Sequence, residues 1–297
     1  MDVNAPRVLD DVTVVIPTLG RDLLQECLQS IARGTVWPTH LVVVDQGSNG
    51  AVVEWLDRLS RLGMSAERVQ SSEQGAAAAR NRGFEHVRTR RVAATDDDCR
   101  VHSHWLERLA ARLDAHPDAI VTGRVVPGRN GTADGWAPSL IEHIPPVVHR
   151  RRLLRRDPLF ANNMGFALRT VERVGAMDEH PTVRYAEDAE WSYRALRAGV
   201  PIVYAPEVEV EHVAWRSDAQ LSEVYRRYAR SQGGFYGHHL RGGDAFVALR
   251  AAYDLLRGPW CVLRGVVTGN SELAAMGRAY ATQLLPGAVA GWRRGAS

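Results

Sequence analysis

Short apolar runs alternate with amphipathic segments along the first part of the chain. The β-branched run at residues 12–16 ends at Pro17 and predicts a buried strand, and apolar residues then recur at helical spacing until Gly34. A second apolar run, at residues 41–44, ends at Asp45. Such alternation predicts parallel βαβ units, in which ligands bind beyond the carboxyl ends of the strands.

The same alternation predicts further elements over most of the chain, which we name by their residue ranges. They are a weak strand near 68–70, a helix over 75–87, a short strand over 92–95, a strand over 119–126, a helix from about 187 to 199, and strands over 201–205 and 208–212. Residues 127–158 are rich in glycine and proline, and we expect them to be irregular.

The pattern becomes helical after Ser217, so we place a domain boundary near residue 216. Glycine and proline pairs predict four breaks in this helical region. The expected breaks are at residues 233–234, 242–243, 258–259 and 286–287.

Apolar residues recur at helical spacing within this last region. One stripe consists of Phe246, Leu249, Tyr253 and Leu256. Such stripes are typical of core packing or of a homodimer face. The helix at residues 260–267 is flanked by arginines and also fits a helix that rests on a membrane surface.

Composition excludes several enzyme classes. All 37 basic residues are arginine and the formal net charge is +3. Without lysine, P-loop ATPases, pyridoxal enzymes and protein kinases lose their usual central residue. The first strand is not followed by the GxGxxG pattern of dinucleotide sites. The basic stretch at residues 149–156 has no interleaved aromatic residues, so we expect no nucleic-acid partner.

The cysteines and the first residues bear on localisation. Cys27, Cys99 and Cys261 are odd in number, far apart and without a CxxC motif, which suits a reducing compartment. The polar N-terminal residues do not form a secretory signal, and no apolar run reaches the roughly 18 residues of a membrane-spanning helix. We expect a cytoplasmic protein, with peripheral contact at the inner face of the membrane left open.

Three adjacent carboxylates, Asp96, Asp97 and Asp98, directly follow a predicted strand. Their mutual repulsion raises their pKa values unless a cation or hydrogen-bond donors offset it. Mg²⁺ or Mn²⁺, shared between carboxylates and substrate phosphates, is the usual solution. A solvated acidic turn is the alternative. Asp45 ends another predicted strand, so parallel strands would place it at the same edge of the sheet.

Four further residues are candidates for chemistry. Glu187 and Asp188 open a predicted helix, where Asp188 fits a general base, although the helix dipole alone also favours acidic residues there. His212 shares strand parity with apolar residues and is either a metal ligand or a core histidine. Arg80 could bind phosphate, pair with a carboxylate at the sheet edge, or lie on the surface.

Taken in order, these segments resemble the family 2 glycosyltransferases with a GT-A fold. The resemblance spans residues 12 to about 213. The matching segments are 14–18 (VVIPT), 43–48 (VVDQGS), 75–83 (GAAAARNRG), 95–98 (TDDD), 163–169 (NMGFALR), 175–179 (GAMDE), 187–188 (ED), 194–199 (RALRAG) and 210–212 (VEH).

The resemblance implies an α/β fold, a Rossmann-like mixed sheet flanked by helices, with a C-terminal helical extension. It implies a catalytic domain at residues 1–216, with a donor half at about 12–100 and an acceptor half at about 101–216. A helical region at 217–297 follows.

The resemblance also implies roles for individual residues. Donor-binding positions are Pro17, Thr18, Asp45, Arg80, Asp96 and Asp97, metal-binding positions are Asp98, Asp96 and His212, and catalytic positions are Asp188, as general base, and Glu187. Gln46 stands where the family more often has a second aspartate.

The implied activity is metal-dependent, inverting transfer of a sugar from a nucleoside-diphosphate sugar to an acceptor hydroxyl, with Mn²⁺ or Mg²⁺ as cofactor. The acceptor is unidentified: a saccharide, a lipid-linked saccharide or a natural product. Acceptor choice is expected to lie in residues 127–158 and the helical tail. Two alternatives stay open, a nucleotidyltransferase that makes a nucleotide sugar and a non-catalytic nucleotide-sugar-binding protein.

Overall fold

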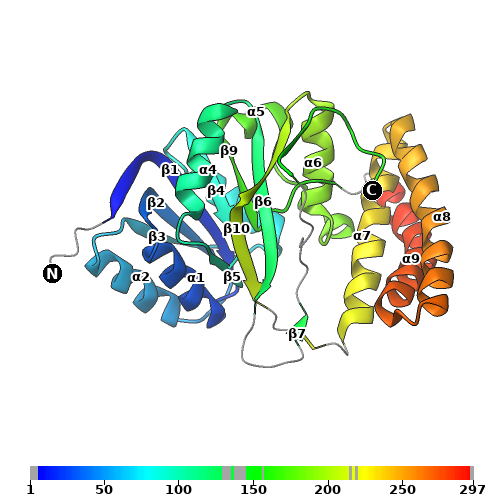
Figure 1. Ribbon diagram of the computed structural model, residues 1–297, viewed down its shortest axis with the longest axis horizontal. Helices are drawn as coiled ribbons and strands as arrows, with labels where there is room; N and C mark the ends of the chain where they lie inside the picture. Colours follow the sequence, from blue (N-terminus) through cyan, green and yellow to red (C-terminus); the bar gives the residue numbers. More distant parts are fainter. Residues whose placement is uncertain are drawn as a thin grey trace. The chain divides into compact units, whose positions relative to one another are not determined.

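The chain forms two compact units in a computed structural model (Figure 1). The structure describes residues 6–128, 135–136, 145–155, 157–213, 216–217 and 220–294. The first unit comprises Met1–Arg152, Pro158–Met177 and Arg194–Trp215, and the second comprises Leu153–Asp157, Asp178–Tyr193 and Arg216–Ser297. The division passes through helix α6 (Glu187–Arg197).

Within its described residues, the first unit is built on a nine-stranded sheet. The strand order is β3-β2-β1-β4-β9-β6-β10-β5, and β8 pairs with β10. The strands are β1 (Arg7–Thr18), β2 (Val36–Asp45), β3 (Ala66–Gln70), β4 (Arg91–Thr95), β5 (Cys99–Val101), β6 (Ile120–Gly128), β8 (Val147–His149), β9 (Asn163–Ala167) and β10 (Ile202–Val213). Two-residue strands β7 (Gly135–Trp136) and β11 (Arg216–Ser217) lie outside this sheet.

Six strands of the sheet run in the same direction. The pairs β1–β2, β2–β3, β1–β4 and β6–β10 are parallel. Strand β9 lies antiparallel between β4 and β6, so β6 and β10 run in the direction of β4. The ends of β1, β2, β4 and β10 therefore share one edge of the sheet, and the candidate residues Thr18, Asp45, Asp96–Asp98 and His212 lie along it.

Helices cover both faces of this sheet. Buried side chains of α1 (Leu23–Ala32), α2 (Ala51–Arg61) and α4 (Trp105–Ala115) share one apolar cluster with Val14 and Ile16 of β1. Helix α3 (Ala76–His86) packs on the other face, against Val15. A Cβ on Gly83 would lie 2.3 Å from Val15 Cγ1, so only glycine permits this close approach.

The mixed sheet confirms the expected fold, and three of its strands were not expected. Strands β5, β8 and β9 were missed because each is short and pairs antiparallel with a strand distant in sequence. The two strands expected at 201–205 and 208–212 are a single strand, β10, with a register shift between Ala205 and Glu209. Of the irregular segment expected at 127–158, residues 129–134, 137–144 and 156 lie outside the described part of the chain.

The second unit is helical. Its long helices are α7 (Leu221–Arg241), α8 (Ala245–Val267) and α9 (Ser271–Arg293), and η1 (Pro181–Val183) adds a short 3-10 turn. Val183, Tyr193, Phe235 and Leu284 belong to its apolar core. Among the described residues, none of the helices combines the length and the apolar character needed to cross a membrane.

Three of the four expected helix breaks are wrong. Only the pair at 242–243 ends a helix, while the other three pairs lie inside α7, α8 and α9. The glycines let helix backbones approach closely instead: a Cβ on Gly287 would lie 2.0 Å from the carbonyl oxygen of Arg230, and one on Gly233 would lie 2.1 Å from that of Leu284. Helix–helix packing thus overrides the local preference of glycine for turns.

One further α-helix, α5 (Arg169–Val174), follows β9 in the first unit. Because β9 is antiparallel to β4, α5 begins at the sheet edge opposite Asp96–Asp98. The two edges therefore differ: one carries the candidate polar residues and the other carries α5.

Candidate active site

Each of the first two carboxylates after β4 has a cationic partner. Arg80 on α3 is 2 % exposed, and its Nη2 lies 2.6 Å from Asp96 Oδ1. Asp97 accepts a 2.7 Å hydrogen bond from the Thr18 hydroxyl and pairs with Arg21. These partners offset the repulsion among adjacent negative charges. Of the alternatives left open for Arg80, the structure excludes the surface location and shows the pairing with a carboxylate at the sheet edge.

The Arg21–Asp97 pair couples the β1–α1 loop to the end of β4. Burial raises the pKa of Asp97, while Arg21 and the Thr18 hydrogen bond oppose that rise. Burial lowers the pKa of Arg21, but the neighbouring carboxylates outweigh it and leave the pKa raised. Arg21 Nη2 also lies 3.3 Å from Asp98 Oδ2, so one guanidinium spans two of the carboxylates.

Asp98, Cys99 and His212 form a compact group of potential metal ligands. One ligand atom of each lies within 4.8 Å of the others, all three residues are buried, and His212 Nε2 is 3.4 Å from Asp98 Oδ1. The antiparallel pairing of β5 with β10 places His212 opposite Cys99. Strand pairing, rather than nearness in sequence, therefore brings the histidine to the acidic segment.

The chemistry of this group suits a hard divalent cation. Mn²⁺ and Mg²⁺ prefer carboxylate oxygen, imidazole is a ligand of transition-metal ions, and a thiol favours softer metals. Burial also raises the pKa of the Cys99 thiol. Asp98 and His212 therefore fit such a cation. Asp96, which was also predicted to bind metal, is not in this group among the described residues and pairs with Arg80.

Asp45 is held rigidly at the end of β2. Its carboxylate is fully buried and accepts hydrogen bonds from Arg68 Nε at 2.9 Å and Nη2 at 2.7 Å, and from the Gly47 amide at 2.8 Å. Thr18 lies opposite Asp45 in the β1–β2 register, next to the buried Pro17. The three predicted donor-binding residues Pro17, Thr18 and Asp45 thus lie together at the sheet edge.

Two arginines of this edge were not predicted from the sequence. Arg21 lies in the loop after β1 and Arg68 lies on β3, one strand away from Asp45. An isolated arginine carries no motif, and only the strand order shows which carboxylate it will meet. The sequence offered one indication: both arginines belong to segments next to strands that end in aspartates.

Two asparagines of the matched motifs form hydrogen bonds that stabilise the fold and do not belong to the candidate site at the sheet edge. Asn81 donates to the Met177 carbonyl oxygen at 2.8 Å and accepts from the Met177 amide at 2.9 Å. Asn163 accepts from Trp105 Nε1 at 2.9 Å and donates to the Val208 carbonyl oxygen at 2.8 Å. Both side chains are buried and satisfied, as buried amides must be.

Glu187 and Asp188 lie in the first turn of α6, within the second unit. Both are half-buried, and Asp188 Oδ1 accepts a 2.7 Å hydrogen bond from the Ala189 amide. The charge of Asp188 also contributes, after burial, to raising the pKa of Asp157. Asp188 therefore lies near a second buried carboxylate, and its role as a base stays a prediction.

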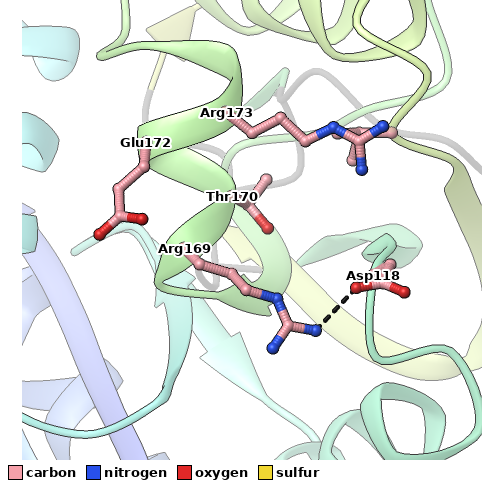
Figure 2. Close-up of a pocket in the computed structure, with 6 residues that line it drawn as sticks. Asp118, Arg169, Thr170, Glu172 and Arg173 are labelled. Atoms are coloured by element: carbon pink, nitrogen blue, oxygen red, sulfur yellow. Dashed lines mark hydrogen bonds and ion pairs between the residues drawn. The ribbon is translucent and has the colours of Figure 1, made fainter.

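A pocket of about 390 Å³ lies at the opposite edge of the sheet (Figure 2). It is lined by Arg169, Thr170, Glu172 and Arg173 of α5, together with Asp118 and Val200. Arg169 Nη2 pairs with Asp118 Oδ1 at 2.7 Å, and Arg173 donates to the Ala198 carbonyl oxygen at 2.9 Å. The arginines of this pocket are already hydrogen-bonded, and none of the site residues predicted from the sequence lines it.

Comparison with known proteins decides the family. The model described as "Glycosyl transferase family 2" matches residues 13–171, which is more than half of the chain. The chain belongs to glycosyl transferase family 2. The resemblance proposed from the sequence is confirmed, and the protein is a glycosyltransferase. The matched segment includes Asp45 and Asp96–Asp98 but ends before Asp188 and His212.

One relative and two solved structures are similar to this chain over most of its length. Glycosyltransferase AglE of Haloferax volcanii is 26 % identical over 222 residues, which are 72 % of this chain and 71 % of that protein. The mannosyltransferase PcManGT of Pyrobaculum calidifontis, in complex with GDP-Man and Mn²⁺, superposes with a TM-score of 0.60 at 16 % identity and covers 95 % of this chain and 85 % of that one.

A second solved structure, residues 1–349 of S. aureus TarS in complex with UDP, has a TM-score of 0.54 at 15 % identity. The superposition covers 91 % of this chain and 90 % of that chain. At these identities, both solved structures support the GT-A fold alone.

Proposed function

We propose that this family 2 glycosyltransferase moves a sugar from a nucleoside-diphosphate sugar to an acceptor hydroxyl, with inversion at the anomeric carbon. The observation that carries the proposal is the Asp98–His212 pair, 3.4 Å apart at the sheet edge that also holds Asp45. Two structural neighbours, PcManGT with GDP-Man and Mn²⁺ and TarS with UDP, support a nucleotide-sugar donor.

Asp98 and His212 would hold a divalent cation, Mn²⁺ or Mg²⁺, with Asp96 as a further predicted ligand. When bound, such an ion stabilises the negative charge that develops on a departing diphosphate. Arg80 and Arg21 carry fixed positive charges beside the same carboxylates. Together with Asp96–Asp98 they leave about one net negative charge, which a bound divalent cation would make positive and so favourable to an anionic donor.

The donor's nucleoside would lie against Pro17, Thr18 and Asp45. Arg68 and the Gly47 amide fix the Asp45 carboxylate in one orientation and bury it. It would accept a hydrogen bond from a ribose hydroxyl once the loop at Gly47 or the Arg68 side chain moves to give access. Asp97, tied to Thr18 and Arg21, would keep the two loops of the donor site together.

Asp188 would take the proton from the attacking acceptor hydroxyl, and Glu187 is the second candidate on the same turn. The Ala189 amide donates a hydrogen bond to Asp188 Oδ1 and so holds the carboxylate at the start of α6, where a general base would act. A base on one side of the anomeric carbon and a leaving group on the other side produce inversion in a single displacement. The acceptor is a saccharide, a lipid-linked saccharide or a natural product.

We also propose the domain division of the sequence analysis as a functional one. The donor half at about 12–100 contains Asp45 and the acidic segment, and the acceptor half at about 101–216 contains Asp188 and His212. The helical region at 217–297 follows. Residues 127–158, expected to help choose the acceptor, lie largely outside the described residues.

The variant Asp188→Asn tests the proposed base. It should bind the donor normally, because no donor-binding residue changes, and lose transfer by about 10³-fold, as expected for removing a general base. Donor binding is measured by thermal shift with Mn²⁺ and a panel of UDP-, GDP-, dTDP- and CMP-sugars, and transfer by product formation from the donor that shifts most.

The matched control is Glu172→Gln, an exposed carboxylate of α5 at the opposite sheet edge. It should transfer sugar at the normal rate. Near-normal transfer by Asp188→Asn would remove Asp188 from its role, and release of pyrophosphate from a sugar phosphate and a nucleoside triphosphate would show nucleotidyl transfer instead.

A further inference from the structure

The outer face of α8 is apolar along its whole length. Leu249, Leu256, Trp260, Leu263 and Val267 recur at helical spacing and are 61, 77, 53, 65 and 76 % exposed. The sequence pattern predicted that Leu249 and Leu256 would face a core or a dimer partner, yet both stay exposed among the residues that the structure describes. The stripe runs from Leu249 to Val267 on this 23-residue helix, a length of about 27 Å.

The neighbouring helix α9 carries a shorter stripe of the same kind. Leu285, Val289 and Trp292 lie at spacings of four and three residues and are 56, 49 and 52 % exposed. Helices α8 and α9 pack side by side through glycines: a Cβ on Gly258 would lie 2.9 Å from the Ala281 amide nitrogen. Exposed apolar residues on this scale mark an interaction surface.

The exposed charge on α8 has a single sign. Among the described residues of α8, Arg264 is the exposed charged residue, and the acidic Asp254 is buried. The Arg264 guanidinium lies 5.1 Å from the centre of the Trp260 ring. On α9, Arg278 and Arg293 are exposed on or beside the apolar stripe, and Glu272 lies in the first turn.

We propose that the outer face of α8 lies flat on an anionic membrane surface. A helix with an exposed aliphatic stripe, tryptophan and flanking arginine is suited to the boundary between headgroups and acyl chains. Tryptophan favours this boundary because its ring is apolar and its N–H is polar. The arginines reach back to lipid phosphates while their methylene groups stay against the apolar stripe.

The charge pattern favours a membrane over a second copy of this chain. In a symmetric dimer the same face meets itself, so Arg264 would meet a face of α8 that exposes no carboxylate. Anionic phospholipids supply the missing counter-charge at any position along the helix. The inference does not depend on the proposed sugar transfer, since its test measures lipid binding.

The test is co-sedimentation of the full chain with vesicles. The chain should bind vesicles of phosphatidylcholine and phosphatidylglycerol more tightly than vesicles of phosphatidylcholine alone, and added salt should weaken this binding. The double variant Leu256→Gln/Leu263→Gln should lose at least about tenfold in affinity, because two exposed side chains no longer enter the acyl region. Arg264→Gln should lose about fivefold, and only on anionic vesicles.

The matched control is Val53→Gln/Leu62→Gln, which removes two exposed apolar side chains, 44 and 59 % exposed, from the first unit. It should bind vesicles like the unaltered chain. Absence of binding to anionic vesicles, or equal loss in both double variants, overturns the proposal. A dimer that forms without lipid and dissociates in the Leu256→Gln/Leu263→Gln variant also overturns it, since a second copy then covers the face.

Discussion

Carboxylates gather in two regions of the molecule, and the two regions hold them differently. At the sheet edge of the first unit, three adjacent aspartates share two arginines, and Asp98 belongs to a group of potential metal ligands. In the second unit, each buried carboxylate comes from a different part of the chain and meets one principal partner. These pairs are Asp157 with Arg250, Asp244 with Tyr193, Asp254 with Tyr236, and Glu190 with His239.

Arg250 is the centre of the second region. Its guanidinium is 2 % exposed, pairs with both Asp157 oxygens at 2.9 and 2.5 Å, and lies over the rings of Tyr193, Phe235 and Tyr236 at 5.3 to 5.6 Å from their centres. Burial lowers the pKa of Arg250, but the Asp157 hydrogen bonds and charge outweigh it and raise the pKa. A charge enclosed in this way stabilises packing and is not placed to meet a substrate.

The difference suggests how to distinguish a ligand-binding site, such as the sheet edge, from the structural framework formed by the buried pairs of the second unit. Like charges adjacent in sequence repel and are stable only with a shared cation, so they indicate a place where a ligand completes the balance. Opposite charges that meet one to one inside a core are already balanced. Altering the first region should therefore affect activity, and altering the second should affect folding.

The largest expected effect is on activity, in the variant Asp98→Asn. Loss of the metal-binding carboxylate should lower transfer by about 10³-fold or more, equivalent to about 4 kcal/mol of transition-state stabilisation. Chelation of divalent cations should abolish the activity of the unaltered chain. The melting temperature of Asp98→Asn should not fall, because the change removes repulsion among adjacent carboxylates.

Activity assays and thermal unfolding of the same preparation separate the two effects. Full activity in chelator would defeat the metal assignment of Asp98 and His212. A strongly lowered melting temperature with retained activity would place Asp98 in the structural framework and erase the contrast between the regions.

The next effect is on stability, in the variant Arg250→Met. Removing the guanidinium leaves the Asp157 carboxylate buried without its partner, which costs about 3 to 5 kcal/mol. The free energy of unfolding, from urea titration, should fall accordingly. Adding Asp157→Asn should restore part of it, and the double-mutant cycle then measures the coupling.

The control for Arg250→Met is Arg278→Met on the exposed side of α9. An exposed arginine contributes little, so the change should stay within about 0.5 kcal/mol. Equal effects of the two substitutions would mean that the Asp157–Arg250 pair is not part of the framework.

More of the sheet edge than of the second unit could be predicted from the sequence. Strands that end in Asp45 and in Asp96–Asp98 are visible as apolar runs, and the topological rule for parallel sheets places their ends together. His212 was assigned to the apolar face by strand parity, and it is buried. What could not be derived is the β5–β10 pairing that puts it beside Asp98, because β5 is three residues long.

The buried pairs and close helix contacts of the second unit could not be predicted from the sequence. Asp157 and Arg250 are 93 residues apart, and no periodicity connects them. Gly287 looks like a helix breaker locally, yet it permits the backbone of α9 to approach Arg230 on α7. Such features depend on which helices pack together, and that information is not carried by local propensity.

The smallest expected effect is a pH dependence in the second unit, at the half-buried His238 of α7. Burial lowers its pKa from the ordinary value of 6.5, and the charges of Arg294 and His239 lower it further, against opposing effects of Asp178 and Glu190. Between the lowered pKa and 6.5 the unfolded chain binds more protons than the folded chain. Folding stability is therefore fully present above pH 6.5 and decreases as pH falls through this window.

An NMR titration of the His238 ring should give a midpoint below 6.5, and His238→Gln should reduce the loss of unfolding free energy between pH 7.5 and 5.5. The physical reason is burial of the His238 ring, to which the nearby positive charge of Arg294 adds. Arg294 itself is already paired with Asp178. A midpoint at or above 6.5 would show that Asp178 and Glu190 dominate, and that the second unit tolerates unbalanced charge as the sheet edge does.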